Sequence, residues 1–531
     1  MAIRVACIGG GPGGLFFSAL LKQAVPEAEV VLFERNQAAD VFGFGVVFSD
    51  ATLRRIDAAD PVLHNALRDF GIHWDDIEVW LKGERKVFAG NGMAAIHRKT
   101  LLKLLQDRAA EVGVEMRFGH FVPSLEELAD FDLVVGADGA NSRTREQLGE
   151  ALGHTTDMAT AKFIWFGTTH MFTGLTFVHR QNEHGNFAVH GYPVSDDLST
   201  FIVETDEDTW HKAGLDEFDV SQPPGPSDVK TQRYLERLFA EDIEGQPLVA
   251  NNSRWANFDT RRTETWHAGN VVLLGDAVHT AHFSVGSGTK MAMEDAVTLA
   301  REVAAHQDDL ELALTNYETD RQPGVTKIQN SARPSLSWWE HFGRYYEAFE
   351  PLQFTLHFFS RSIDIDKIRQ RDPELVDAVE QDWRARHGAE PLETPFTAGP
   401  VTFGSRLLSI SQDRGKLTLT GTDGRSLALT TERSQAASDR GLVVTAPESE
   451  DGLHRAFEQL PAKAAVVVVQ GGNSLTRALL SEEARLGRGL KTVIVDDRDT
   501  NSAVTLVLSG RADAVVSPVA TAAIHAEAIH A

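Results

Sequence analysis

The sequence predicts an α/β protein: a Rossmann-like domain interrupted by an antiparallel β-sheet, followed by a helical extension and a small C-terminal α/β domain. A short apolar run at the N-terminus precedes a glycine turn and a helical pattern, which is the order strand, turn, helix. Between residues 155 and 269, apolar and polar residues alternate as in half-buried antiparallel strands. Near residue 390 the composition shifts to Pro, Gly and Thr, which indicates a linker before the last domain.

Composition excludes several classes of protein. The chain has 531 residues, 42% of them hydrophobic, which is ordinary for a folded protein of two or three domains. A net charge of -25 argues against partners such as nucleic acid or an anionic membrane, because both need a basic surface. The single cysteine, Cys7, lies in an apolar run, so we expect a buried thiol and a reducing, cytoplasmic location. We expect neither a signal peptide nor a membrane-spanning helix.

The first glycine turn carries a nucleotide-binding pattern. Gly9, Gly11 and Gly14 match G-x-G-x-x-G, with Pro12 inside the turn, between a strand and a helix. Glycines there permit a tight turn, close approach of a pyrophosphate and close packing of helix on strand. The next predicted strand ends at Glu34, where a carboxylate can accept hydrogen bonds from ribose hydroxyls and disfavours a 2′-phosphate. Together these features predict a dinucleotide site.

Further polar residues lie next to the ends of predicted elements. Arg35 follows Glu34 and is either a cofactor contact or a solvated charge at the strand end. Arg98 begins a helical pattern, where a positive charge opposes the helix dipole unless an anionic partner is present. Asp138 follows the apolar run FDLVVGA, and Asp276 follows VVLLG. Both carboxylates are therefore expected at the carboxyl ends of strands.

Two histidines follow Asp276. His279 and His282 are of a residue type that binds metals or acts as a base. Asp276 is the one acidic residue near them in the sequence, and no G-x-S-x-G motif is present, so neither a metal site nor a hydrolase triad is favoured. We expect His279 to be structural and His282 to be the better candidate for a ligand contact.

Aromatic and small residues alternate in two regions that are candidates for a flat ligand. In FGFGVVFSDATLRRI, Phe44 and Val46 either pass over such a ligand or belong to a glycine-kinked core loop, before a helix expected to begin near Ser49. In the alternating region, His190 and Tyr192 share a strand face. They either belong to the core and solvent faces of one sheet or form walls of a ring-binding pocket.

These motifs, in this order, resemble the group A flavoprotein aromatic hydroxylases of the p-hydroxybenzoate hydroxylase fold, over the range from residue 1 to about residue 333. The resemblance implies an FAD cofactor, O2 as co-substrate and NADH or NADPH as reductant. It places the adenosine ribose at Glu34, the phosphates near Arg98 and the ribityl chain at Asp276, with Asp138 in support. The implied cofactor residues are Gly9, Gly11, Pro12, Gly14, Glu34, Arg35, Arg98, Asp138, Asp276, Gly286, Ser287, Gly288 and Thr289, the last four beside the isoalloxazine.

One segment departs from the usual family pattern. His282 and Phe283 stand where relatives have two prolines, and Ser287 replaces a glutamine. This variant, with FGFGVVFSDATL and SARPSLSWWE, is similar to a branch that hydroxylates aromatic CoA thioesters, the salicylyl-CoA 5-hydroxylases and anthraniloyl-CoA monooxygenases. The resemblance implies conversion of salicylyl-CoA to its 5-hydroxy (gentisyl-CoA) product. The alternatives are anthraniloyl-CoA, or a free aromatic or natural-product ring. Candidate pocket residues are Phe44, Val46, His190, Tyr192 and Phe283, with His282 as the candidate base.

The expected domains follow from these motifs. We expect an FAD-binding domain in two pieces, a substrate-binding sheet, a helical extension and a small α/β domain, at residues 1–154 with 270–335, 155–269, 336–390 and 395–531. The charged helices of the extension are compatible with a homodimer surface or with a cap on a bundle. The flanks of the last domain resemble the two ends of a flavin ene-reductase barrel. A complete barrel needs ~250 residues, so we expect a shortened, non-catalytic remnant.

Overall fold

The computed structural model describes residues 2–41, 43–49, 53–223, 225–413 and 415–518. The contacts divide the chain into two compact units, each taken separately below. Unit 1 holds residues 1–83 and 90–341, and unit 2 holds residues 84–89 and 342–531. The boundary expected at residues 335/336 falls inside one continuous helix, α9 (Leu310–Ala348). The assignment of residues 84–89 to unit 2 was not expected.

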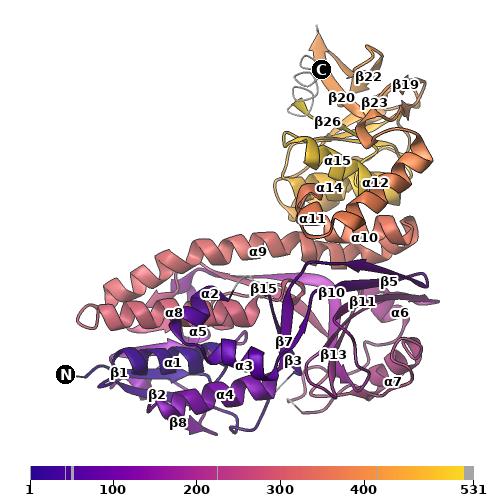
Figure 1. The fold of residues 1–531 in the computed structure, drawn as a ribbon. Helices are drawn as coiled ribbons and strands as arrows, with labels where there is room; N and C mark the ends of the chain where they lie inside the picture. Colours follow the sequence, from indigo (N-terminus) through magenta and orange to yellow (C-terminus); the bar gives the residue numbers. More distant parts are fainter. Residues whose placement is uncertain (1, 42, 50–52, 224, 414, 519–531) are drawn as a thin grey trace. The chain divides into compact units, whose positions relative to one another are not determined.

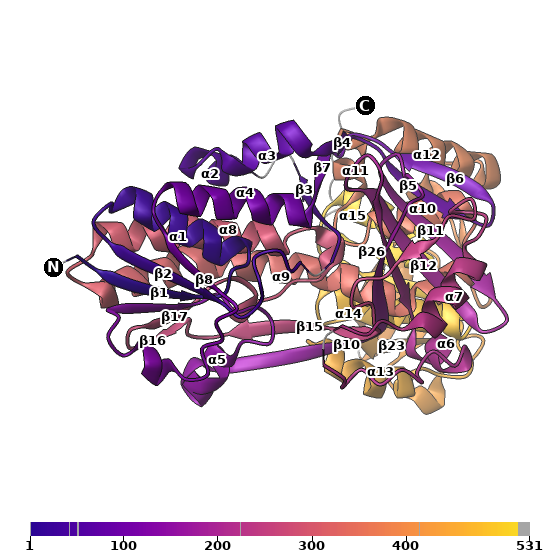
Figure 2. The ribbon, with the colours of Figure 1, turned by 90° about the horizontal axis from the view of Figure 1, so that it is seen from below.

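A six-stranded sheet forms the first part of unit 1, in the order β16-β17-β9-β1-β2-β8. Neighbouring strands are parallel except β16, which pairs antiparallel with β17. Three helices cover one face of this sheet (Figures 1 and 2). The elements are β1 (Arg4–Ile8), β2 (Glu29–Glu34), β8 (Glu115–Phe118), β9 (Leu133–Gly136), β16 (His267–Ala268), β17 (Val271–Leu273), α1 (Pro12–Ala24), α4 (Arg98–Glu111) and α8 (Gly288–Ala305). Helix α5 (Arg143–Leu148) contributes to the other face.

Glycines in the first turn let α1 lie close to its neighbours. A Cβ on Gly14 would lie 2.2 Å from the carbonyl oxygen of Gly9. A Cβ on Gly13 would lie 2.5 Å from the side chain of Leu274, beside α8. Any larger residue at either position would push the helix away from the sheet or from α8, so these glycines serve packing.

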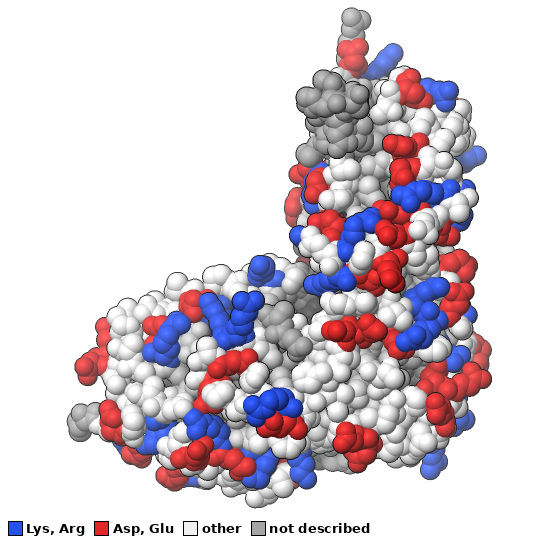
Figure 3. Space-filling model, in the orientation of Figure 1, with Lys and Arg blue, Asp and Glu red and all other residues white. Residues whose placement is uncertain are grey.

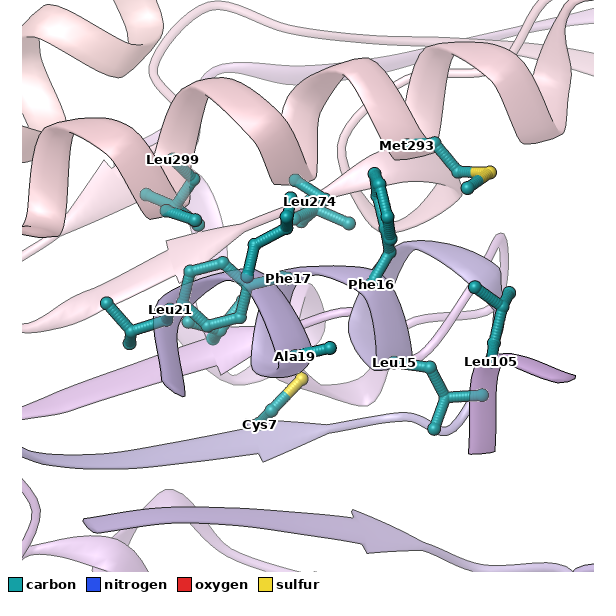
Figure 4. Packing of buried hydrophobic residues seen from close by; sticks show 14 of the residues in the cluster. Cys7, Leu15, Phe16, Phe17, Ala19, Leu21, Leu105, Leu274, Met293 and Leu299 are labelled. Carbon is teal, nitrogen blue, oxygen red and sulfur yellow. The ribbon is translucent and has the colours of Figure 1, made fainter. Parts of the chain in front are cut away.

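The core around α1 is apolar on all sides. Figure 4 shows Leu15 of α1 beside Leu105 of α4, and Phe16 and Phe17 directed toward α8. Cys7 lies on β1 beneath the helix and is fully buried. Burial raises the pKa of its thiol to about 12. The expectation of a buried thiol is therefore confirmed.

A second sheet follows, with the order β14-β10-β13-β12-β11-β5 within unit 1, and β15 also pairs with β10. Strands β10 to β13 are antiparallel, whereas β5 is parallel to β11. The strands are β5 (Ile77–Leu81), β10 (His154–Thr168), β11 (Leu175–Asn182), β12 (Gly185–Pro193), β13 (Ser199–Thr205), β14 (Leu248–Val249) and β15 (Ala256–Thr263). Figure 2 shows β10 and β15 as long strands that run toward the first sheet.

The two faces of this second sheet differ in chemistry. One, here called the apolar face, packs on α6 (Glu207–Lys212) and α7 (Val229–Leu238) through a core that includes Phe166, Phe187 and Phe201. The other, here called the polar face, is fixed by the strand register, which sets residues side by side across the sheet. It carries Phe163, Trp165, Phe177, His179, His190, Tyr192, Thr200, Ile202 and Glu204.

A small sheet in the order β3-β7-β4 lies beside the first helices of unit 1. It consists of β3 (Gly45–Ser49), β7 (Met93–His97) and β4 (Ile72–Trp74), and helices α2 (Arg54–Ala59) and α3 (Val62–Phe70) accompany it. The helix expected near Ser49 does not begin there. Ser49 is still paired with Met93 in the sheet, because Val46, Val47 and Phe48 favour a strand. Residues 50–52 lie outside the described residues.

Helix α9 brings aromatic side chains to the polar face. Within unit 1, the ring of Trp339 lies 4.4 Å from that of His190 and 5.8 Å from that of Phe177, between centroids. His179 stacks on Trp339 at 6.0 Å, and burial lowers the pKa of His179 to about 3. Trp339 therefore closes one end of the polar face.

Unit 2 contains a closed barrel of seven described strands, in the order β20 to β26. Strands β20 to β22 form an antiparallel meander, β22 to β26 are parallel, and β26 closes on β20. The meander replaces strand–helix units, so the ring closes although the segment is too short for a full (β/α)8 barrel. The strands are β20 (Leu407–Asp413), β21 (Lys416–Gly421), β22 (Ser426–Thr430), β23 (Gly441–Thr445), β24 (Val467–Gln470), β25 (Thr492–Val495) and β26 (Ala514–Val516). An origin in an ene-reductase barrel stays a prediction.

Helices and short strands surround this barrel. They are β6 (Glu84–Phe88), α10 (Pro351–Phe359), α11 (Ile365–Arg371), α12 (Pro373–His387), β18 (Phe396–Ala398), β19 (Val401–Phe403), α13 (Leu453–Gln459), α14 (Ser474–Glu482) and α15 (Thr500–Leu508). A buried polar cluster ties α10 to α14: Glu482 accepts from the Tyr345 hydroxyl at 2.5 Å and lies 3.1 Å from His357 Nε2. Strand β6 is held by Phe88 against Phe359, with 4.1 Å between ring centroids.

Charged side chains of both signs lie on the surface. Figure 3 shows Lys and Arg side chains lying among Asp and Glu on the face in view. Of the helices that the structure describes, none has the length and apolarity required to cross a membrane.

Candidate active site

A cavity of about 180 Å³ lies at the carboxyl ends of β1, β2 and β9. Its lining includes Gly9, Gly11, Glu34, Arg35 and Asp138, five of the residues singled out in the sequence. It also includes residues that the motifs did not indicate: Asn36, His120, Phe121, Asn141, Arg143 and Thr144. The carboxyl ends of parallel strands are where α/β sheets bind nucleotides.

Glu34 is held in place by its own hydrogen bonds. Its carboxylate accepts from the backbone N–H of Gly10 at 2.7 Å, and from the backbone and side-chain amides of Asn36 at 2.8 and 2.7 Å. A carboxylate has about four acceptor sites, so it can still accept a ribose hydroxyl. Pro12 and Gly14 are buried in the first turn of α1, behind this wall.

Asp138 shapes the opposite wall. Its carboxylate accepts from the hydroxyls of Ser142 at 2.5 Å and Thr144 at 3.1 Å, and from the backbone N–H groups of Arg143 and Thr144 at 2.9 and 3.0 Å. These bonds fix the N-terminus of α5. Asp138 therefore acts on the cavity mainly through the position of α5, in line with the supporting role that the resemblance implied.

Arg98 and Asp276 face each other at the next part of the predicted cofactor path. Arg98 is half-buried, and among the described residues its guanidinium has neither a hydrogen bond nor an ion pair. Burial lowers the pKa of Arg98, and the charge of Asp276 opposes that shift. Asp276 is accessible to solvent, yet the protein around it raises the pKa of its carboxyl, against the charges of His279 and Arg98. The two side chains influence each other without contact, which leaves room for a ligand.

The loop that precedes α8 presents backbone groups rather than side chains. Gly286 has a φ of +59°, in the left-handed region, and ends the short 3-10 turn η5 (Phe283–Val285). Within the described part of the chain, no side chain caps the first N–H groups of α8, which begin at Gly288. The hydroxyl of Ser287 is buried and has no hydrogen-bond partner there either. These groups, with Thr289, are placed to bind electronegative ligand atoms.

His279 has a structural environment. Its Nε2 lies 2.7 Å from Asp295 Oδ2, and Asp295 also accepts from Arg321 Nε at 2.7 Å and from the backbone of Gly275. Asp276 is the acid nearest to His279 in the sequence, but the carboxylate that contacts His279 is that of Asp295, which α8 brings back to this loop. Among the described residues, no group of three or more His, Cys, Asp or Glu is placed to hold a metal ion.

His282 and Phe283 pack directly onto the polar face. The ring of Phe283 lies 5.1 Å from Phe163, 5.7 Å from Trp165 and 5.6 Å from His190, between centroids. His282 is buried, and its Nε2 lies 3.8 Å from Glu204 Oε2. Glu204 was not singled out in the sequence.

The other expected pocket residues are divided between two places. Tyr192 lies on the polar face, 6.4 Å from Trp74 between ring centroids, and burial raises the pKa of its hydroxyl to about 12. Phe44 is buried against Gly167, where a Cβ would lie 2.8 Å from the Phe44 ring. The structure does not bring Val46 to this wall. Its side chain belongs to the core around α1, and the next residue, Val47, points to the polar face.

Comparisons with known proteins decide the family. An FAD binding domain family model matches residues 2–332, which includes all three sheets described above for unit 1. The chain is 57% identical over 97% of its length to a salicyloyl-CoA 5-hydroxylase of Streptomyces sp., and covers 99% of that protein. It is 36% identical, over 63% of its length and 89% of the relative, to a 3-hydroxy-4-methyl-anthranilyl-[aryl-carrier protein] 5-monooxygenase of Streptosporangium sibiricum.

The chain belongs to the FAD-dependent monooxygenases. A solved structure of Pseudomonas aeruginosa PqsL in complex with 2-aminobenzoylacetate shares the fold, with a TM-score of 0.50, 23% identity, and coverage of 65% of this chain and 99% of that one. The similarity to the Streptomyces enzyme extends through unit 2 of this monooxygenase, whereas the family match ends at residue 332.

The residues of the monooxygenase fit FAD on their own geometry. Gly11 has an ordinary φ of -75°, and no described protein atom lies within 4 Å of where its Cβ would be. The same is true of the space beside Gly288. The backbone does not need glycine at either position, so the open space in front of them is what a bound pyrophosphate and isoalloxazine require.

Proposed function

We propose that this monooxygenase hydroxylates the ring of salicyloyl-CoA at C5, para to the ring hydroxyl, to give gentisyl-CoA. The observation that carries the proposal is the 57% identity to a salicyloyl-CoA 5-hydroxylase over 97% of the chain. The Streptosporangium relative is named for an aryl group held on a carrier protein, which supports a thioester-linked ring. The alternatives are anthraniloyl-CoA and a free aromatic or natural-product ring.

The residues proposed to hold FAD follow the path described above. Gly9, Gly11, Pro12 and Gly14 would accommodate the pyrophosphate at α1, Glu34 and Arg35 the adenosine, and Arg98 the phosphates. Asp276 would hold the ribityl chain, and Gly286, Ser287, Gly288 and Thr289 the isoalloxazine edge, while Asp138 supports the wall. FAD, reduced by NADH or NADPH, supplies activated oxygen from O2 when bound.

Residues of the polar face would hold the substrate ring and exclude water. Phe163, Trp165 and Phe283 form an apolar wall that can hold an aromatic ring flat and exclude water. An aromatic surface of this kind is suited to a substrate with a ring. A hydroxyl on the ring can meet the polar groups beside the wall, which are Tyr192, His190 and the Ser284 hydroxyl.

One experiment tests the function. Purified protein should show the visible absorbance of a flavoprotein, and it should oxidise NADH or NADPH faster with salicyloyl-CoA than without it. Mass spectrometry should find one added oxygen on the thioester. Salicylate and anthraniloyl-CoA serve as matched substrates. A colourless protein would contradict FAD binding, and equal stimulation by free salicylate would contradict the CoA thioester.

Gly11 offers a test of the cofactor site. The variant Gly11→Ala should fold, since its Cβ meets no described protein atom, but should retain less FAD after dialysis because the Cβ enters the pyrophosphate position. Gly324→Ala, in helix α9, is the matched control, and its Cβ makes only an ordinary contact at 3.8 Å. Equal FAD content in the two variants would contradict the assignment.

A cytoplasmic location and a homodimer are also proposed. The first is supported by a single, buried cysteine, and the second by the exposed charged residues of α11 and α12. Light scattering of the purified protein checks the second, since a monomeric mass would contradict it.

A further inference from the structure

An asparagine joins two distant parts of unit 1 beside the proposed cofactor site. Asn251 lies in the connection between β14 and β15, and its side-chain amide donates to the carbonyl oxygens of Val41 at 3.1 Å and Gly43 at 3.2 Å. These two acceptors precede β3 and lie 210 and 208 residues earlier in the sequence. A side-chain amide has two N–H bonds, and here both are used on one short stretch of backbone.

The position of Asn251 is fixed by the second sheet. Its backbone N–H donates to Ser253 Oγ at 3.1 Å, and that hydroxyl donates to the carbonyl oxygen of Trp165 on β10 at 2.5 Å. Ser253 is buried, and its backbone N–H and carbonyl oxygen pair with Ser227 and Asp228. The side chain of Asn251 therefore extends from a well-anchored part of the sheet, and it can hold a second segment in place.

The backbone that Asn251 holds lies directly against Arg98. The carbonyl oxygen of Phe44 accepts from the backbone N–H of Arg98 at 2.8 Å. A Cβ on Gly43 would lie 3.7 Å from Arg98 Nη1, so the main chain of Gly43 passes close to the guanidinium. Gly43 has a φ of +80°, a conformation that suits glycine. A shift of this backbone would therefore change the surroundings of Arg98.

Carbonyl oxygens beside Arg98 compete with a ligand for its guanidinium. In the described part of the chain the guanidinium has neither a hydrogen bond nor an ion pair, and hydrogen bonds from a charged donor are the strong ones. A carbonyl oxygen that loses its donor is destabilised unless it finds another. Without Asn251, the carbonyl oxygens of Val41 and Gly43 would be left to turn toward Arg98. A guanidinium that binds its own backbone is less available to an anion.

We propose that Asn251 is a positioning residue for the cofactor: it occupies the carbonyl oxygens of Val41 and Gly43 and so keeps the Arg98 guanidinium available for the phosphates of FAD. The inference rests on the proposed function, in which Arg98 meets those phosphates. Asn251 acts through the backbone before β3 and not by contact with FAD. In the alternative, a purely structural role, the same hydrogen bonds only fasten that backbone to the second sheet.

The dissociation constant of FAD tests the proposal. The full-length holoenzyme is diluted in steps, and the FAD that dissociates is measured by its fluorescence. The variants are Asn251→Ala and Asn251→Leu, since leucine has the branched shape of asparagine without an N–H to donate. Each substitution is also combined with Arg98→Gln, which removes the cation. The four proteins of each set form a double-mutant cycle, which shows whether the two residues act on FAD together.

Asn257→Ala is the matched control. The side-chain amide of Asn257 also donates to backbone carbonyl oxygens, those of Ala159 at 2.9 Å and Thr160 at 3.1 Å, but both acceptors belong to β10. The substitution removes the same kind of hydrogen bond from the same sheet without touching the backbone beside Arg98. Denaturant unfolding of every variant checks that it is folded at the dilutions used.

We expect both Asn251 variants to raise the dissociation constant of FAD about tenfold, the usual effect of weakening one hydrogen bond from a charged group. In the Arg98→Gln background the same substitutions should change it by less than about twofold, because the cation that the carbonyl oxygens would capture is absent. Asn257→Ala should bind FAD as tightly as the wild type.

Three results would overturn the proposal. An equal rise of the dissociation constant with and without Arg98 would mean a purely structural role, and wild-type values in both Asn251 variants would mean no role at all. A tenfold rise in Asn257→Ala would show that any loosening of the sheet weakens FAD binding. If the wild type binds no FAD, the proposed function fails together with this inference, whereas the first three results leave the function intact.

Discussion

The two faces of the second sheet are built from the same strands, yet they differ in almost every property. Phe166 and Phe201 of the apolar face are fully buried against α7 and its flanks, with Phe239 5.6 Å from Phe201 between ring centroids. On the polar face, Glu204 and His190 are as deeply buried, but they are polar. A polar face is ordinary for an antiparallel sheet when water covers it, but charged side chains are rarely buried as deeply as Glu204. The buried polar groups of this face support the proposal that the substrate ring binds there.

The largest effect on stability should come from a substitution that creates a cavity on the apolar face. Phe201→Ala should lower the free energy of unfolding by about 3–5 kcal/mol, because a fully buried ring is lost. Trp165→Ala on the polar face should cost less than about half of that, since Trp165 is already partly exposed, but it should raise KM for the aryl-CoA. Denaturant unfolding and steady-state kinetics measure both. Equal destabilisation by the two variants would break the distinction between the faces.

The second effect should be an unchanged or higher thermal stability. Glu204→Leu combined with His190→Leu makes the polar face resemble the apolar one, and replacing both partners of a buried polar contact by apolar residues can be neutral or stabilising by about 1–4 kcal/mol. We expect an unchanged or higher Tm together with loss of hydroxylation. Glu204→Leu alone is the comparison, and it should be less stable than the double variant. A strongly destabilised double variant would mean that the pair is retained for stability.

Two glycines, one on each face, give a smaller effect. A Cβ on Gly191 would lie 2.4 Å from the ring of Phe172 in the apolar core, so Gly191→Ala should cost about 1–3 kcal/mol of stability. A Cβ on Gly167 would lie 2.8 Å from Phe44 on the other side. Gly167→Ala should therefore displace Phe44 and change KM more than stability. The same measurements apply, and a reversed pattern would contradict the assignment of the faces.

The smallest effect should come from Tyr192→Phe. Burial raises the pKa of Tyr192 from its usual 10 to about 12, so the hydroxyl is neutral at and well above neutral pH. Its contribution to stability is fully present below pH 10 and is lost only as pH rises toward 12. We expect hydroxylation to fall less than about tenfold, since one hydrogen bond is worth about 1 kcal/mol. The pH profile below pH 9 should match the wild type, and a profile that changes there would assign Tyr192 a proton-transfer role.

Local patterns were enough for the first part of the molecule. Gly9, Gly11, Gly14 and Glu34 lie within one strand–turn–helix–strand unit, so their spacing already fixes their geometry. The alternation of β10 and β12 also showed which residues share a face. Such features depend on residues close in sequence, where backbone geometry alone decides position.

Long-range pairing could not be read in the same way. Glu204 sits in a run of alternating residues like its neighbours, and only the register with β10 and β12 places it between His190 and His282. Asp295 reaches His279 because α8 folds back over the Gly275 turn. Val46 and Val47 are neighbours in one strand, so their side chains point to opposite faces of it. The pairing of β3 with β7 determines which of the two faces the second sheet. Closure of the barrel in unit 2 likewise depends on the antiparallel meander β20–β22, which the length of the segment alone does not predict.

Strand β6 has a consequence for how the chain is made. Its neighbour Ala89 donates its backbone N–H to Asp372 at 2.9 Å, across a separation of 283 residues, and Phe88 packs on Phe359. At a synthesis rate of about 5–20 residues per second, the ribosome adds Asp372 roughly 15 to 60 seconds after Ala89. During that interval β6 cannot form its contacts with Phe359 and Asp372, and the ring of Phe88 stays exposed to solvent. A chain that ends at residue 341 would lack these partners altogether, so a single cut cannot separate the two units. We expect chaperones to bind this short segment while the rest of unit 2 is being made.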